Sequence, residues 1–244
     1  MQTFFSQQGE DLFVFTNFIN QKRDDGRYLE LGALDGVTYS NTKFFHDHLG
    51  FKGVLIEPLP SAYENLSTNR PADDTYNVAI SSSNDPVSFV GTWATAGMTS
   101  VMADSFKDAH HPNQEEYFVP SRPLGEVLHE SSISYLDFFC LDVEGGELEV
   151  LKTMDWTIPV YVFCVELDGH NEEKDEECRD ILRNNGFVFE QRMCINEFWR
   201  NPNYNRKDLL FGKNQEPKEE QQHVCMEPHC IPEIKEGLES YAQK

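Results

Sequence analysis

Short, nearly continuous apolar runs alternate with amphipathic segments along the chain, in a β-α-β-α order. Apolar runs of this length are typical of strands that are buried on both faces of a parallel sheet. The amphipathic segments between them can cover both faces as helices. The sequence therefore predicts an α/β fold with a doubly wound, Rossmann-like and mostly parallel sheet. Its five predicted parallel strands are Arg27–Ala33, Lys52–Pro58, Asp74–Ile80, Tyr135–Val143 and Tyr161–Leu167.

The amphipathic segments have recognisable helix ends. The first begins at Ser40-Asn41-Thr42, which are good capping residues, and the last stops at Asn185-Gly186, which favours a left-handed C-cap. An N-terminal helix at about Gly9–Gln21 is expected to pack on the sheet or to cover its open end. The helices predicted between strands are Ser40–Leu49, Ser61–Thr68, Leu124–Glu130, Gly146–Met154 and Glu172–Asn185.

The remaining segments divide the chain into three parts. Two further strands, Phe187–Ile195 and Asp208–Lys213, flank a polar Asn-Pro-Asn loop and predict an antiparallel hairpin at the sheet edge. Residues 93–123 contain three prolines and are predicted to be a long insertion without regular structure, which is often a binding loop. We expect an N-terminal helical lid segment at 1–26, the α/β domain at 27–212 and a polar C-terminal tail at 213–244.

The charge of the 244-residue chain narrows the range of partners. Twenty Lys and Arg against forty-two Asp and Glu give a formal net charge of −22. Such a surface repels nucleic acids and anionic membranes. A neutral or cationic small molecule, or a neutral polymer such as a glycan, remains as partner, and the oligomeric state is left open. Six dilute cysteines, no signal peptide and no long apolar run favour a cytoplasmic location.

A glycine-containing turn follows the first strand and is the strongest candidate for ligand binding. Glu30-x-Gly32-x-x-x-Gly36 leads into the helix at Ser40. The middle glycine of the dinucleotide fingerprint is missing, so a pyrophosphate is disfavoured. Glu57 closes the second strand, where open α/β sheets bind ribose hydroxyls. A nucleoside with a cationic group and no pyrophosphate fits these acids: S-adenosylmethionine meets that description, and NAD does not.

Three motifs, taken together, resemble the FkbM-type S-adenosylmethionine-dependent methyltransferases of class I. They are Ser6-Gln7-x-Gly9-Glu10-Asp11, Glu30-x-Gly32-Ala33-x-Asp35-Gly36 with Ser40-Asn41-Thr42, and Asp142-Val143-Glu144-Gly145. The resemblance covers roughly residues 4–212 and implies that 27–212 form a class I methyltransferase domain. Members are typically O-methyltransferases that act on sugars or hydroxylated natural products. The implied function is methyl transfer to a hydroxyl of a sugar, glycan or other polyhydroxylated molecule; the alternative is a non-catalytic protein that binds a nucleoside or a partner.

The resemblance also implies which residues bind the cofactor. Glu30, Gly32 and Ala33 would contact its methionine half, with Ser40 and Asn41 at the carboxylate. Glu57 would hold the ribose diol. The other implied cofactor-binding residues are Gln7, Asp11, Asp35, Ala79, Ile80 and Asp142. Gln7 and Asp11 have a second interpretation, because such residues at a helix start are also simple caps.

The ends of the fourth and fifth strands supply candidate catalytic residues. Asp142 follows the fourth strand at the ligand crevice and is expected beside the transferring methyl group, with Glu144 on the same side. His170, after the fifth strand, is a candidate general base. Alternatively, Asp142 and Asp168 would bind Mg²⁺ or Mn²⁺, which prefer oxygen ligands and lower the pKa of a bound hydroxyl. The sequence leaves the choice between base and metal open.

Overall fold

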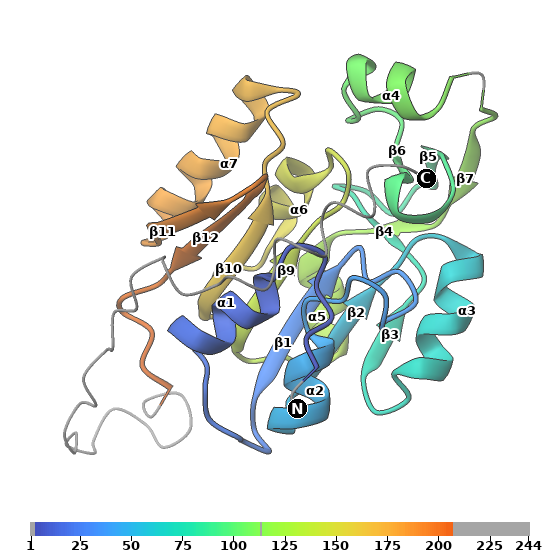
Figure 1. The fold of residues 1–244 in the computed structure, drawn as a ribbon. Helices are drawn as coiled ribbons and strands as arrows, with labels where there is room; N and C mark the ends of the chain where they lie inside the picture. Colours follow the sequence, from blue (N-terminus) through green and yellow to red (C-terminus); the bar gives the residue numbers. More distant parts are fainter. Residues whose placement is uncertain (1–2, 113, 207–244) are drawn as a thin grey trace, which may run out of the picture.

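A seven-stranded sheet forms the centre of the computed structural model, which describes residues 3–112 and 114–206 (Figure 1). The strand order is β11-β12-β10-β9-β1-β2-β3. The β10, β9, β1, β2 and β3 strands are parallel, whereas β12 is antiparallel to both β10 and β11. This confirms the predicted α/β fold with a mostly parallel sheet and an antiparallel edge. The strands are β1 Arg27–Leu31, β2 Lys52–Ile56, β3 Asp74–Tyr76, β9 Leu136–Leu141, β10 Val160–Glu166, β11 Val188–Met193 and β12 Asn196–Arg200.

Helices cover both faces of this sheet (Figure 1). Successive side chains of a strand point to opposite faces, so Phe138 and Phe139 of β9 enter two separate hydrophobic clusters. The Phe139 cluster includes side chains of α5, α6 and α7, and the Phe138 cluster includes side chains of α1, α2 and α3. Both faces are therefore buried, which is why the strands are continuously apolar. The helices are α1 Glu10–Asn17, α2 Lys43–Leu49, α3 Pro60–Asn69, α5 Leu124–Glu130, α6 Glu147–Thr153 and α7 Glu172–Asn184.

The third predicted strand is interrupted. β3 ends at Tyr76, and β4, Ala79–Ile80, leaves the central sheet to pair in parallel with β8, Ser121–Arg122. The break lies at Asn77, whose side-chain amide donates to the backbone oxygens of Glu57 and Pro58. These bonds turn the chain across the end of β2 and bring Ala79 and Ile80 towards the ligand crevice.

The insertion is ordered, which corrects the prediction of a structureless segment. β5 (Val87–Val90), β6 (Gly97–Met98) and β7 (Tyr117–Val119) form an antiparallel sheet, accompanied by α4 (Asp104–His110). Phe89, Met98 and Val119 are buried together in its small core. The apolar side chains are spread over strands of two to four residues, too short to give a clear periodicity.

The antiparallel hairpin forms, but its second strand is not the one predicted. β11 is followed after a short turn at Cys194 by β12, which lies between β10 and β11. Phe198 and Trp199 of β12 are buried in the two opposite clusters. The Asn-Pro-Asn loop therefore comes after the hairpin, and Asp208–Lys213 and the tail at 213–244 lie outside the described residues. Within residues 3–112 and 114–206, none of the helices combines the length and apolarity needed to cross a bilayer.

A cluster of aromatic rings in the core predicts a measurable loss of stability when one ring is removed. Phe163 of β10 is fully buried and contacts the rings of Phe139, Trp156 and Phe187. Phe163→Ala should lower the free energy of unfolding by about 3–5 kcal/mol, because it removes apolar burial and leaves a cavity. Urea unfolding followed by circular dichroism measures this change.

Phe189 supplies the control, because it is 51% exposed on the edge strand β11. Phe189→Ala should cost about 1 kcal/mol or less. Equal losses from the two substitutions would contradict the assignment of Phe163 to the packed core.

Candidate functional site

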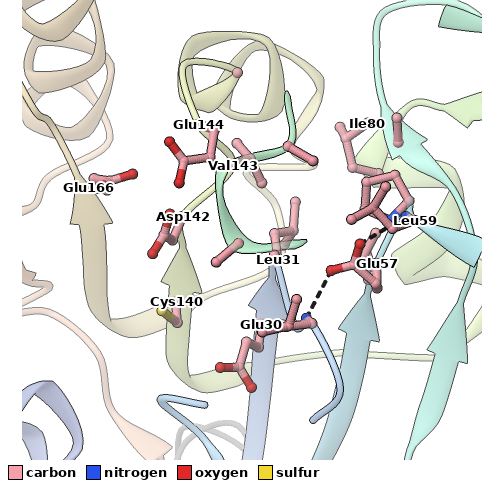
Figure 2. A pocket seen from close by; sticks show the side chains of 18 of the residues that line it. Glu30, Leu31, Glu57, Leu59, Ile80, Cys140, Asp142, Val143, Glu144 and Glu166 are labelled. Atoms are coloured by element: carbon pink, nitrogen blue, oxygen red, sulfur yellow. Dashed lines mark hydrogen bonds between the residues drawn. The ribbon is translucent and has the colours of Figure 1, made fainter. Parts of the chain in front are cut away.

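A cavity of about 180 Å³ opens where the carboxyl ends of β1, β2, β9 and β10 meet (Figure 2). Open α/β sheets bind their ligands at this edge. Each of the four strands contributes an acid at or just beyond its end, and the loop after β9 adds another. Among the described residues that line the cavity, five are carboxylic acids and none is Lys, Arg or His: the acids are Glu30, Glu57, Asp142, Glu144 and Glu166.

The ends of β1 and β9 approach one another because residue 32 is glycine. Gly32 has a φ of +78°, a left-handed conformation that side chains rarely adopt, and a Cβ there would lie 1.9 Å from the backbone oxygen of Asp142. The Asp142 backbone N–H donates to the Leu31 oxygen at 3.3 Å. Glycine at this position therefore allows the two strand ends to form one continuous wall of the cavity.

Residues of the loop that follows β1 donate hydrogen bonds to both carboxylate oxygens of Glu30. Its Oε1 accepts the backbone N–H of Asn41 at 2.7 Å, and its Oε2 accepts the hydroxyls of Ser40 and Thr42. Asn41 lines the cavity, and its buried Oδ1 has no hydrogen-bond partner among the described residues. Ser40 supports Glu30 from behind and does not itself line the cavity. Thr42 is a partner of Glu30 that the sequence analysis did not identify.

Glu57 is held by backbone groups on both sides. Its two carboxylate oxygens accept the N–H groups of Leu34 and Leu59, each at 2.8 Å (Figure 2). Burial raises the pKa of Glu57 to about 7, since these two hydrogen bonds only partly offset the loss of water. Glu57 therefore has a fixed orientation and a charge that changes near neutral pH.

Strained backbone is concentrated around the cavity. Four residues that line it have positive φ although they carry side chains: Leu34 at 50°, Tyr39 at 59°, Trp93 at 68° and Glu144 at 54°. Each such residue costs of the order of 1–3 kcal/mol and persists only where the surrounding structure fixes it. Clusters of such residues are typical of functional sites.

Three of the acids converge at the β9 and β10 ends of the cavity (Figure 2). Carboxylate oxygens of Asp142, Glu144 and Glu166 all lie within 4.8 Å of one another. Burial raises the pKa of Asp142 to about 6 and that of Glu144 to about 9, and it raises that of Glu166 well above its usual range. Like charges add to the shift, because the deprotonated acids repel one another. At neutral pH the cluster therefore holds both charged and protonated acids, which is useful for proton transfer.

Glu166 is not among the site residues predicted from the sequence, which include Asp168 two residues later. The register of the sheet supplies the missing signal: Val165 pairs with Leu141, so the next residues along the two parallel strands, Glu166 and Asp142, lie side by side. Asp168 lies beyond the end of β10, and its Oδ1 accepts the His170 N–H at 2.8 Å. The structure thus gathers Asp142 with Glu144 and Glu166, and not with Asp168.

His170 does not line the main cavity. It is exposed, its Nδ1 lies 3.0 Å from the hydroxyl of Ser105, and its ring packs edge-on against Phe106. With Asp168 it borders a small neighbouring hollow that also contacts Glu144. The structure therefore gives His170 no direct contact with the Asp142 side of the cavity.

The other predicted cofactor-binding residues divide into two groups. Gln7, Ala79 and Ile80 line the cavity, and Ile80 is labelled in Figure 2. Three do not line it: Ala33 belongs to the core below, Asp35 accepts the N–H groups of residues 37 and 38 in its own turn, and Asp11 accepts those of residues 5 and 6. Asp11 and Asp35 thus shape the loops around the cavity.

The match to a family model identifies this architecture. The model of the methyltransferase FkbM domain matches residues 30–189, from Glu30 of β1 into β11. The chain belongs to the FkbM methyltransferase family. It is therefore assigned to the S-adenosylmethionine-dependent methyltransferases, in agreement with the resemblance found in its motifs.

Solved structures of low identity are similar to this chain. Methyltransferase FkbM from Methylobacillus flagellatus KT is 14% identical with a TM-score of 0.47; the alignment covers 80% of this chain and 48% of that one, so the chain spans about half its length. Aeropyrum pernix fibrillarin with bound S-adenosyl-L-methionine is 11% identical, with a TM-score of 0.45 and coverages of 80% and 73%. A Burkholderia thailandensis N1-methyltransferase of 1,6-didemethyltoxoflavin is 8% identical, with a TM-score of 0.42 and coverages of 80% and 77%. No curated protein matches the chain.

The cavity suits the chemistry of this cofactor. A sulfonium and an ammonium group are cationic, and carboxylates are the complementary partners. The two ribose hydroxyls are hydrogen-bond donors, which the carboxylate oxygens of Glu57 can accept. The Asn41 Oδ1, which has no partner among the described residues, is a further acceptor in the cavity.

The pKa of Glu57 predicts how cofactor affinity depends on pH. Cofactor hydroxyls that donate to Glu57 would favour its charged form, so we expect binding to be strongest above its pKa of about 7. The affinity for S-adenosylhomocysteine should fall as pH decreases through 7, by at most about tenfold per pH unit from this one group. Titration calorimetry between pH 5.5 and 8.5 measures it.

Two variants test this assignment. Glu57→Gln should bind weakly and lose most of the slope, because an amide does not titrate. Asp35→Asn should keep the slope, because Asp35 does not line the cavity. An unchanged slope in Glu57→Gln would show that another group controls the affinity.

Proposed function

We propose that the protein is an S-adenosylmethionine-dependent O-methyltransferase whose acceptor is a neutral polyhydroxylated molecule, such as a sugar or glycan. The observation that carries this proposal is the lining of the cavity, with five carboxylic acids and no cationic side chain among its described residues. Beside the acid cluster of Asp142, Glu144 and Glu166, a phosphate or carboxylate group of the acceptor finds no cationic partner among the described lining residues and is repelled. Hydroxyl groups are suitable partners, because they donate hydrogen bonds to carboxylates.

The acid cluster supplies the proton chemistry in this proposal. When bound, S-adenosylmethionine supplies an activated methyl group. Asp142, with a pKa of about 6, is ionised at neutral pH and accepts the proton of the acceptor hydroxyl. Glu144, with a pKa of about 9, keeps its proton and donates a hydrogen bond that orients the acceptor oxygen. The two acids thus have different roles because their surroundings separate their pKa values.

Aromatic side chains at the cavity support a ring-shaped acceptor. Trp93 and Tyr39 line the cavity, yet they are 54% and 43% exposed. An aromatic face in this position can stack on the C–H face of a sugar ring, whose hydroxyls then point to the carboxylates.

A divalent cation is a second proposal for the same cluster. Asp142, Glu144 and Glu166 offer oxygen ligands only, which Mg²⁺ and Mn²⁺ prefer. A cation there would lower the pKa of the acceptor hydroxyl and would replace Asp142 as the activating group.

Transfer of labelled methyl from S-adenosylmethionine to a panel of glycosides, oligosaccharides and hydroxylated metabolites tests the proposed function. Neutral acceptors should be methylated, and their phosphorylated or carboxylated analogues should react at least about tenfold more slowly, since one unfavourable charge contact costs about 1.4 kcal/mol or more. Binding of S-adenosylhomocysteine without transfer to any acceptor would instead support a non-catalytic binding protein.

Asp142→Asn tests the proposed base. The variant should bind S-adenosylhomocysteine within a few fold of the unmodified protein and lose about 10²–10⁴-fold in kcat, because the amide cannot accept the proton. Asp168→Asn is the matched control, and its kcat should change little. Equal effects of the two substitutions would remove Asp142 from the reaction centre.

A chelator distinguishes the base from the metal. The reaction with Asp142 as base should proceed unchanged in EDTA, because no cation takes part. Loss of activity in EDTA and its recovery with Mg²⁺ or Mn²⁺ would favour the metal. In that case the Glu166→Gln variant should not recover activity when the cation is added.

A further inference from the structure

Arg70 lies fully buried beneath the loop that binds Glu30, and it does not line the cavity. It caps the C-terminal end of α3, and its Nη1 donates to the backbone oxygen of Gly36 at 3.0 Å. A Cβ at Gly36 would lie 2.6 Å from the Arg70 Cγ, so the guanidinium stem occupies the space that a larger residue 36 would need. Arg70 and the glycine loop are thus packed as one unit.

The hydrogen bonds of Arg70 lead to Glu30 through two hydroxyls. Its Nη1 lies 3.4 Å from the Ser40 Oγ and its Nη2 lies 3.2 Å from the Thr42 Oγ1. A guanidinium can only donate, so both hydroxyls must accept from it. The single proton of each hydroxyl is then directed to the carboxylate of Glu30, which both hydroxyls contact. The arginine therefore helps to direct two of the three bonds that hold Glu30; at Ser40 the backbone N–H groups of Thr42 and Lys43 also donate to the Oγ.

The buried charges around Arg70 include more carboxylates than cations. Arg70 is paired with Asp73 at 2.9 Å, and Asp73 also accepts from the Tyr28 hydroxyl and lies 3.3 Å from His46 Nδ1. One buried guanidinium thus faces two carboxylates, those of Asp73 and Glu30. A cationic ligand group at Glu30 would complete the balance.

The remaining titratable groups near Glu30 come from the neighbouring strands. Cys140 lies on β9 and Cys164 on β10. A hydrogen bond with Cys164, together with burial, raises the pKa of the Cys140 thiol, and burial raises that of Cys164. Asp142 at the end of β9 adds negative charge. Burial raises the pKa of Glu30, and Arg70 is the strongest opposing influence. Removal of the guanidinium would leave Glu30 among neutral and negative neighbours.

We propose that Arg70 is a positioning residue for the cofactor: through Ser40 and Thr42 it fixes the Glu30 carboxylate, as an anion, towards the cationic ammonium group of S-adenosylmethionine. This inference rests on the proposed function only for the identity of the cofactor. The role of Arg70 is tested by ligand binding and not by activity. Binding of the cofactor without methyl transfer would overturn the proposed function, but the effect of Arg70 on binding could still be measured.

Titration calorimetry with S-adenosylhomocysteine on the full chain tests the role of Arg70. Arg70→Met should weaken binding at pH 7 by at least about tenfold, the effect of one lost ionic contact. The ratio of its Kd to that of the unmodified protein should shrink as pH rises from 6 to 9, because Glu30 then ionises without help. Arg70→Lys keeps the charge and should restore the pH profile. Part of the affinity should remain lost, because lysine lacks the planar guanidinium that donates to both hydroxyls.

Arg179→Met is the matched control for loss of a buried arginine. Arg179 is 9% exposed and pairs with Glu197, and neither residue lines the cavity. A loss of affinity no larger than in Arg179→Met, or a Kd ratio that does not change with pH, would overturn the proposal. If Arg70→Met fails to fold, Thr42→Val must show the same affinity loss and pH-dependent ratio, and a Thr42→Val protein with unchanged affinity would overturn it too.

Discussion

Four adjacent parallel strands carry a carboxylate at or just beyond their ends, and burying these acids together is the constraint on which the rest of the site depends. The strands β10, β9, β1 and β2 contribute Glu166, Asp142, Glu30 and Glu57 in that spatial order. A parallel sheet places these ends at one edge, so side chains far apart in the sequence share one cavity. Taking several carboxylates out of water is costly unless donors, protons or cations compensate each of them. The structure compensates Glu30 and Glu57 in one way and Asp142 and Glu166 in another.

The loops after β1 and β2 are built to supply donors. Glu57 receives two backbone N–H groups, and Glu30 receives one backbone N–H and two hydroxyls. The left-handed Gly32 and the glycine-rich turn make this geometry accessible, because the backbone must approach both the acid and the neighbouring strand. Buried Arg70 then fixes the hydroxyls in turn. Conformational strain in these loops is therefore balanced by a dense set of hydrogen bonds.

Much of this arrangement is encoded locally and could be predicted from the sequence. The continuous apolar runs identify the five parallel strands, and the acids at positions 30, 57 and 142 lie within or near the ends of those runs, where the glycine turn, the strand-end position and the family motifs mark them. Glu166 lies within the fifth run in the same way, but no glycine turn and no family motif marks it. Only its register beside Asp142 shows that it reaches the cavity. The interruption at Asn77 and the small sheet of the insertion depend on tertiary hydrogen bonds and on strands too short to have a periodic pattern.

In the proposed function, Glu30 and Glu57 bind the cofactor and the acids at the ends of β9 and β10 take part in the reaction, and their surroundings differ accordingly. Glu30 and Glu57 are satisfied by the protein, so their orientation is fixed before a ligand arrives. Asp142, Glu144 and Glu166 instead share a crowded space, and burial and mutual repulsion raise their pKa values. Acids with strongly different pKa values can hold and release protons near neutral pH. In the proposed function, the same edge of the sheet thus separates cofactor recognition on β1 and β2 from proton chemistry on β9 and β10.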